Sequence, residues 1–102
     1  MTITPDQQKA IGEICRAYTR KLEKGGKPGP FLIELIRTFP HPSPVQKKII
    51  QQSRRAFETA TRLENPRPIH DKILQVVCGW GDTLEEPEVL SHLTAIATIE
   101  RF

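Results

Sequence analysis

The stretch QKKIIQQSRRAF, residues 46–57, combines basic and apolar residues at the spacing of an amphipathic helix. At about 100° per residue, the basic side chains gather on one side of this helix and a stripe of apolar ones on the other. The side predicted to face solvent carries Lys47, Lys48, Arg54, Arg55 and Arg62. The side predicted to face a core carries Val45, Ile49, Ser53, Ala56, Phe57, Ala60 and Leu63. The pattern therefore predicts a helix from the end of the proline-rich residues 40–44 to about Leu63.

Helix-start signals stand before this helix and again near the N-terminus. Both SPVQ, residues 43–46, and TPDQ, residues 4–7, place a capping hydroxyl first, a proline second and a glutamine fourth. The hydroxyl and the glutamine can satisfy free amides of the first turn, and proline suits the first helical position. The N-terminal signal opens a helix that ends at the glycines of residues 25–26. Its predicted buried stripe is Ile11, Ile14, Cys15, Tyr18 and Leu22.

The segment FLIELIRTF, residues 31–39, is apolar on nearly every side. Periodicity alone does not separate a short buried strand from a buried helix. Leucine and glutamate dominate the segment and β-branched residues do not, which favours a helix. We expect this helix in the middle of a bundle, with Glu34 and Arg37 reaching the surface.

Two more helices are predicted in the C-terminal part of the chain. The first follows the proline-rich break at residues 65–68 and stops at the glycines on either side of Trp80. Its apolar stripe is Ile69, Ile73, Val76, Val77 and Trp80. The second starts near Pro87 after an acidic loop, and its buried side is Val89, Leu90, Leu93, Ile96 and Ala97.

Short loops rich in proline and glycine join these segments. We therefore expect an all-α fold, a compact single-domain bundle of four to five helices over residues 1–102. No apolar run approaches the roughly 18 residues of a membrane span, and the N-terminus lacks the features of a signal peptide. A cytoplasmic location is expected, in which Cys15 and Cys78 are buried, reduced thiols.

Charge is unevenly distributed along the chain, although the net charge is only +3. Residues 1–63 contain 12 lysines and arginines against 5 acidic residues, whereas residues 64–102 contain 3 against 7. This asymmetry suggests that one part of the protein surface meets a polyanion.

The three histidines offer no catalytic or metal-binding arrangement. His41, His70 and His92 lack the i, i+4 histidine partner or Cys-x-x-Cys pair that makes zinc binding specific. Neighbours in sequence do not face each other on a helix, which argues against His70 with Asp71 and Ser91 with His92 as catalytic pairs. We expect no enzyme activity, no cofactor and no metal, and structural roles for the histidines.

Two glycine-containing stretches each have a structural and a functional interpretation. EKGGKPGP, residues 23–30, lacks the Gly-Lys-Ser/Thr and the preceding strand of a phosphate-binding loop. A plain helix connection is favoured there, and phosphate contact through its lysines is the alternative. In CGWGD, residues 78–82, Trp80 is expected in the core. Its alternative role is an aromatic anchor for a partner protein, together with Phe102.

The basic side of the helix around residues 46–57 suits contact with a nucleic-acid backbone, because each neutralised phosphate releases counterions. Three basic residues of the first helix are expected to help: Arg16, Arg20 and Lys24. The alternative is an ordinary solvated face, in which Glu58 pairs with Arg54 or Arg62. The proline-rich turn is longer than in a helix-turn-helix, and the aromatic residues fall mostly on apolar stripes. Backbone contact is therefore favoured over sequence reading or base stacking.

In size and helical make-up the chain resembles the small helical subunits of CRISPR surveillance complexes, and no sequence motif carries this resemblance. It implies a subunit that lines nucleic acid without doing chemistry. The first hypothesis is accordingly a non-enzymatic subunit that holds DNA or RNA by its phosphate backbone within a larger assembly of protein subunits. The second is a protein–protein adaptor or regulatory bundle, in which Trp80, Phe102 and the acidic C-terminal part dock a partner. Neither hypothesis involves a membrane or a small-molecule substrate.

Overall fold

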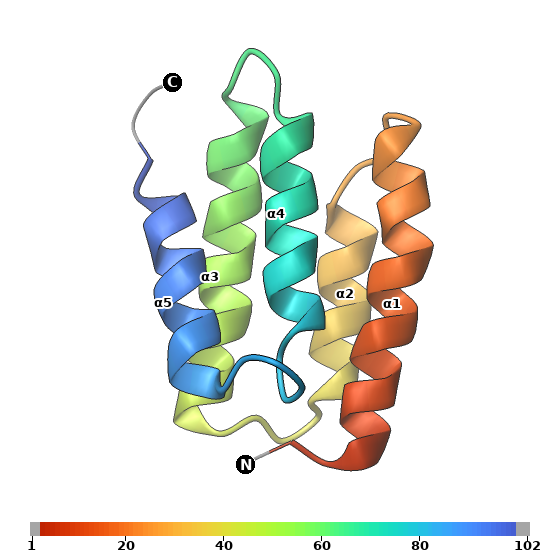
Figure 1. Ribbon diagram of the computed structural model, residues 1–102, viewed down its shortest axis with the longest axis vertical. Coiled ribbons are helices and arrows are strands. Elements are labelled where there is room, and N and C mark those ends of the chain that lie inside the picture. The colour runs from red at the N-terminus through yellow and green to blue at the C-terminus, as the bar shows by residue number, and fades with distance from the viewer. Residues whose placement is uncertain (1–2, 100–102) are drawn as a thin grey trace.

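The computed structural model describes residues 3–99, and in that range it contains five α-helices and no β-strand (Figure 1). The helices are α1 (Pro5–Glu23), α2 (Gly29–Thr38), α3 (Pro44–Thr61), α4 (Arg67–Cys78) and α5 (Glu86–Ala97). The predicted all-α bundle is confirmed, and each predicted helix is present. Within the same range, no helix combines the length and the apolar character needed to cross a bilayer.

Capping boxes begin α1 and α3, as the sequence predicts. Thr4 Oγ1 accepts a hydrogen bond from the amide of Gln7 at 3.1 Å, and Gln7 Oε1 accepts one from the amide of Thr4 at 3.0 Å. Ser43 and Gln46 repeat this exchange in α3 at 3.2 and 2.8 Å. All five helices also have a proline in their first turn. The prolines therefore define helix starts, where the missing amide has no partner to lose.

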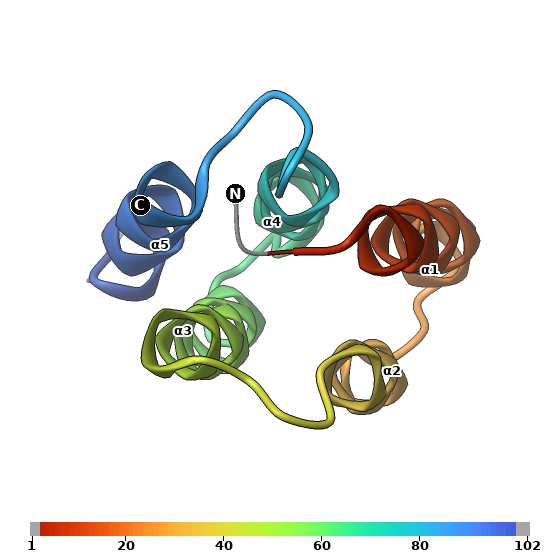
Figure 2. The ribbon, with the colours of Figure 1, turned by 90° about the horizontal axis from the view of Figure 1, so that it is seen from below.

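The helices are arranged around the bundle in the order α1, α2, α3, α5, α4 (Figure 2). Each helix packs against its two neighbours in this order, and α3 also contacts α4. Within residues 3–99, α1 and α3 do not pack against each other. The two helices with the most basic residues, α1 and α3, therefore do not contact each other.

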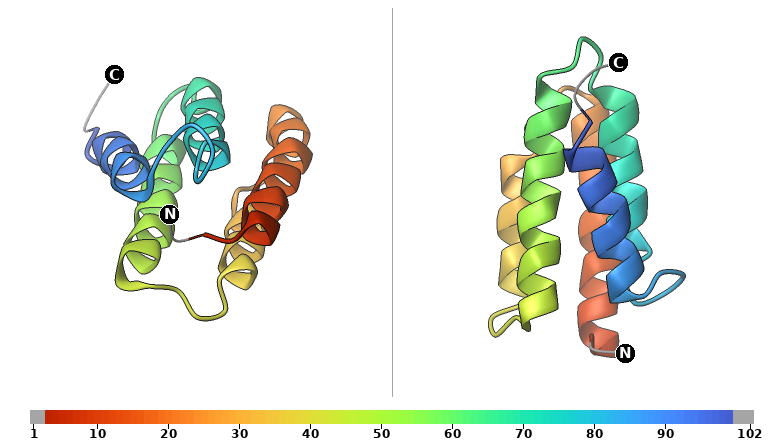
Figure 3. Two further views of the ribbon diagram at one scale, coloured as in Figure 1. Left: turned by 60° about the horizontal axis from the view of Figure 1, so that its bottom comes forward. Right: turned by 90° about the vertical axis from the view of Figure 1, so that its left-hand side faces the viewer.

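The most extensive contact is between α3 and α5, which run parallel (Figure 3). Near their first turns, Gln46 Nε2 donates a hydrogen bond to Glu86 Oε2 at 3.2 Å. Near their last turns, Thr59 Oγ1 donates one to the carbonyl of Ala97 at 3.0 Å. α4 follows α3 in the sequence and runs in the opposite direction, so it brings the chain back to the end of the bundle where α3 began (Figure 1). α5 can therefore start there and run parallel to α3.

Aromatic rings form a connected series through the core. Tyr18, Phe31 and Phe57 meet edge to face, with ring centroids 5.7 and 5.6 Å apart. His70 follows, 5.4 Å from the Phe57 ring. Edge-to-face contact is a favoured geometry for aromatic pairs. These four rings come from α1, α2, α3 and α4, so the series joins four of the helices.

α2 lies at the edge of the bundle, between α1 and α3 (Figure 2). Phe31 and Leu35 are its buried residues, whereas Ile33 and Ile36 are each 52% exposed. The predicted helix in this segment is confirmed, and it ends at Thr38, but the expected place in the middle of the bundle is wrong. A helix with two neighbours buries one stripe, so apolar residues outside that stripe stay at the surface.

The buried side of α3 differs from the predicted stripe at its two ends. Val45 is 38% exposed, and Leu63 is half-buried beyond Thr61, where the helix ends. Gln46, which the helical stripe does not include, is buried instead. In the first turn Gln46 takes the buried place and its amide bonds to Glu86 of α5, whereas Leu63 follows Thr61, after the helix has ended.

One carboxylate oxygen joins the ends of three helices. Glu86 Oε2 accepts hydrogen bonds from Trp80 Nε1 at 3.1 Å and from Gln46 Nε2 at 3.2 Å. Trp80 is fully buried, and its ring stacks on Phe39 with centroids 4.6 Å apart. The contact connects the start of α3, the residues just after α4 and the first residue of α5.

Replacing Glu86 with alanine should destabilise the bundle, because the buried indole N–H of Trp80 would lose its acceptor. An orphaned buried donor costs roughly 1–3 kcal/mol. Urea unfolding followed by tryptophan fluorescence measures the change in the free energy of unfolding. Asp82→Ala removes a charge from an exposed position in the neighbouring loop and serves as the control, expected within about 0.5 kcal/mol of the parent. Equal stability of Glu86→Ala and the parent would show that this junction does not hold the helices.

Candidate nucleic-acid interface

The basic face of α3 consists of Lys47, Lys48, Arg54, Arg55 and Arg62, and all five residues are exposed. On the opposite side of the helix, Ile49, Ala56 and Ala60 have no exposed surface. The predicted orientation of the basic side chains towards solvent is therefore confirmed. At 1.5 Å per residue, the distance from Lys47 to Arg62 along the helix is about 22 Å.

Most of the positive charge on this face has no acidic partner within the described part of the chain. Arg54 Nε lies 3.3 Å from Glu58 Oε1, one turn away. Both side chains are more than half exposed, so this pair stabilises the helix only slightly. No ion pair joins Lys47, Lys48, Arg55 or Arg62 to a carboxylate of residues 3–99. The face thus presents five positive side chains against the single negative charge of Glu58.

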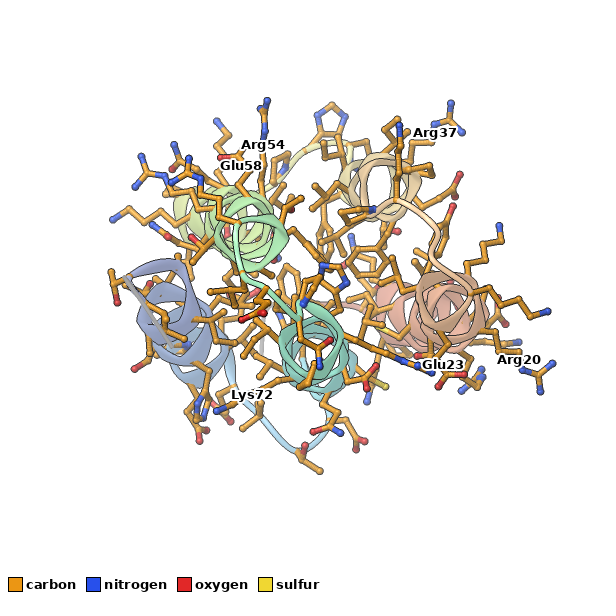
Figure 4. All side chains as sticks on the ribbon, turned by 90° about the horizontal axis from the view of Figure 1, so that it is seen from above. Arg20, Glu23, Arg37, Arg54, Glu58 and Lys72 are labelled. Atoms are coloured by element: carbon orange, nitrogen blue, oxygen red, sulfur yellow. The ribbon has the colours of Figure 1, made fainter. Side chains whose placement is uncertain are left out.

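The basic residues of α1 lie on a different surface. Arg16, Arg20 and Lys24 are exposed at four-residue spacing along α1. Seen from above, Arg20 and Arg54 point away from the bundle on opposite sides (Figure 4). These α1 residues therefore do not extend the basic face of α3, and their contact with nucleic acid stays a prediction. The position of a residue on its own helix does not reveal how two helices are oriented, and here α2 and α4 separate α1 from α3.

The two predicted partner-binding aromatics have different outcomes. Trp80 is fully buried between Phe39 and Glu86, which agrees with the expected core role and corrects the alternative of a ring that contacts a partner. Phe102 lies outside the described residues. A docking surface on the described part of the protein would therefore use other side chains.

Acidic residues gather at the end of the bundle where α3 and α5 begin. Asp82, Glu85 and Glu86 line a cavity of about 290 Å³. Its other lining residues are mostly apolar: Ile3, Val45, Trp80, Gly81, Leu84 and Pro87. Carboxylates beside apolar walls favour a cationic group with an aliphatic stem. The acidic stretch at residues 82–88 was visible in the sequence, but the cavity combines it with two distant segments.

The EKGGKPGP stretch connects α1 to α2, as favoured from the sequence. Gly25 has a φ of 84°, a conformation that glycine adopts without strain. A Cβ on Gly26 would lie 2.7 Å from the carbonyl oxygen of Lys21, so this position also requires glycine. Both glycines are accounted for by the tight end of α1.

The side chains of residues 3–99 form no cluster of three or more histidine, cysteine or acidic residues that could hold a metal ion. His41 and His92 are exposed, and His70 is buried against Phe57. Among the residues that the structure describes, His70 Nε2 finds no hydrogen-bond partner. Burial lowers the pKa of His70, and Asp71 opposes this shift.

Comparison of the chain with protein-family models, with curated proteins and with solved structures finds no match.

Acidification should destabilise the protein through His70. Its pKa in the folded state lies below the ordinary value of 6.5, so the unfolded chain binds the proton more readily. The stabilising contribution of neutral His70 is complete above about pH 6.5 and decreases as the pH falls towards the lower folded-state pKa. Thermal unfolding between pH 7.5 and 5 should show a smaller loss of stability in His70→Leu than in the parent. His92→Gln, at an exposed position, should keep the parent's pH dependence, and an equally steep dependence in His70→Leu would contradict this assignment.

Proposed function

We propose that the protein is a non-enzymatic helical subunit that holds the phosphate backbone of a nucleic acid within a larger nucleoprotein complex. The observation that supports this most directly is the basic face of α3, where four of five exposed cations have no ion pair within residues 3–99. A basic surface that its own protein does not neutralise is suited to a polyanion.

The dimensions of the face fit a run of phosphates. Phosphates of one strand of double-stranded DNA are spaced 3.4 Å along the helix axis, so about 22 Å corresponds to roughly six of them. Long, flexible lysine and arginine side chains can adjust to such a run without a fixed register. α3 is a regular helix of 18 residues, so it presents these side chains from a stiff support.

Contact with the backbone is favoured over contact with the bases. Tyr18, Phe31, Phe39, Phe57 and Trp80 are all buried, so the described part of the chain has no exposed phenylalanine, tyrosine or tryptophan ring for base stacking. The exposed side of α3 carries mainly lysine and arginine side chains, and contacts of such groups with phosphates position a protein without reading sequence. The proposal is therefore for binding that depends little on sequence and weakens as salt increases.

The alternative is a protein–protein adaptor with no nucleic-acid contact. One observation favours it: Ile33 and Ile36 form an exposed apolar pair on α2. Large apolar side chains on a surface are often contact points for other proteins. The two functions differ in one measurable property, because an adaptor whose basic residues only solubilise it would not bind DNA or RNA in a salt-dependent way.

Reversing two charges on the basic face should weaken nucleic-acid binding at least tenfold. Lys48→Glu with Arg55→Glu is the informative variant, because neither side chain has an ion pair to lose within residues 3–99. Fluorescence anisotropy with labelled single-stranded DNA, double-stranded DNA and RNA at about 50 mM salt measures the affinity. The salt dependence of the parent's affinity reports how many phosphates it contacts.

The matched control is Arg20→Glu with Lys24→Glu on α1, which changes the net charge equally on a different side of the bundle. It should lose less than about threefold in affinity. Equal losses in the two variants would mean that net charge matters and the α3 face does not. A parent protein that binds none of the three polymers would leave the adaptor as the better proposal.

A further inference from the structure

Cys15 on α1 and Cys78 at the end of α4 lie side by side, although they are far apart in the sequence. α1 and α4 pack along each other, both cysteines line one cavity, and Cys78 contributes to raising the pKa of Cys15. Both are free thiols in the structure. The expectation that both are buried holds for Cys15, which is 3% exposed, and is wrong for Cys78, which is exposed.

The pair opens onto a surface cavity. Between α1 and α4 there is a space of about 350 Å³. Its lining residues are Cys15, Arg16, Thr19, Glu23, Asp71, Leu74, Gln75 and Cys78. The space exceeds the volume of several water molecules, so a molecule as small as hydrogen peroxide can reach the exposed Cys78 sulfur.

The two thiols have different environments. Burial raises the pKa of Cys15 to about 12, the neighbouring Cys78 adds to the rise, and Arg16 lowers it. Cys15 is therefore protonated at neutral pH, and the exposed Cys78 is the sulfur that meets an oxidant from solvent. Arg16 is the cation of the cavity, whereas Glu23 and Asp71 are its anions. An exposed thiol with a second thiol beside it is the arrangement found in redox-sensing cysteine pairs.

We propose that Cys78 and Cys15 form a redox modification site in which hydrogen peroxide converts the two thiols to a disulfide between α4 and α1. The Cys78 thiolate attacks one oxygen of the peroxide, the O–O bond breaks, and the leaving hydroxide becomes water with the proton released by the thiol. Cys78 is then a sulfenic acid. Cys15 Sγ bonds to its sulfur, the S–O bond breaks, and the leaving hydroxide takes the Cys15 proton as a second water. The thiols give up two electrons and two protons in total, which reduce the peroxide to two waters.

The disulfide would restrain the chain over a long loop. The loop from Cys15 to Cys78 contains the second part of α1 and all of α2, α3 and α4. A cross-link that closes so long a loop strongly reduces the conformational entropy of the unfolded chain. Oxidation should therefore make the bundle harder to unfold, and a thiol reductant should reverse the change. The site is independent of the proposed nucleic-acid binding, because neither cysteine belongs to the basic face of α3.

The test is to oxidise the reduced, folded full chain with a small excess of hydrogen peroxide. Intact mass spectrometry should show a monomer that has lost two hydrogen atoms, and a non-reducing digest should contain Cys15 joined to Cys78. The melting temperature should rise by roughly 10 °C, and dithiothreitol should restore the original value. Addition of oxygen to Cys78 without a cross-link, or an intermolecular dimer through Cys78, would overturn the proposal.

Two serine variants separate the roles of the sulfurs. In Cys15→Ser, peroxide should leave a Cys78 sulfenic acid that dimedone traps. In Cys78→Ser, the buried Cys15 should stay unmodified under the same conditions. Dimedone labelling of Cys15 in Cys78→Ser would show that the order of attack is wrong. If circular dichroism shows that either variant fails to fold, the presence or absence of the Cys15–Cys78 cross-link in the oxidised parent chain still decides whether the disulfide forms.

Discussion

The hydrogen bonds of one carboxylate oxygen, Glu86 Oε2, hold together the part of the bundle on which the candidate interface depends. Trp80 and Gln46 both donate to it. These bonds fix the residues just after α4, the start of α3 and the start of α5 relative to one another. At the other end, Thr59 bonds to the carbonyl of Ala97. These contacts fix the parallel α3–α5 pair, and an α3 held in this way has only one side left for solvent. The basic residues occupy that side.

Local features of this fold could be read from the sequence because their causes are local. The capping boxes of Thr4 and Ser43 depend on residues three positions apart, and the apolar stripe of α1 depends on helical spacing. The exposure of the basic face of α3 follows from the same spacing once its opposite side is buried. Proline and glycine positions predict the helix ends for the same reason.

Features that require two helices to be placed relative to each other could not be read in this way. The edge position of α2, with Ile33 and Ile36 exposed, depends on which helices lie beside it. The separation of Arg20 from Arg54 depends on α1 and α3 being kept apart by their neighbours (Figure 4). The acidic cavity at the α5 start combines Ile3, Val45 and the α4–α5 loop. Hydrophobic periodicity describes each helix alone and carries no information on these arrangements.

The charged surface of the protein has parts with different roles, and we propose that α3 is the part that contacts the nucleic acid. Two-dimensional ¹⁵N NMR during titration with a short oligonucleotide of DNA or RNA tests that claim residue by residue. We expect salt-dependent shifts concentrated between Lys47 and Arg62, with α1 around Arg20 nearly unaffected. Shifts concentrated on α1 or around Ile33 of α2, or no shifts at low salt, would contradict it.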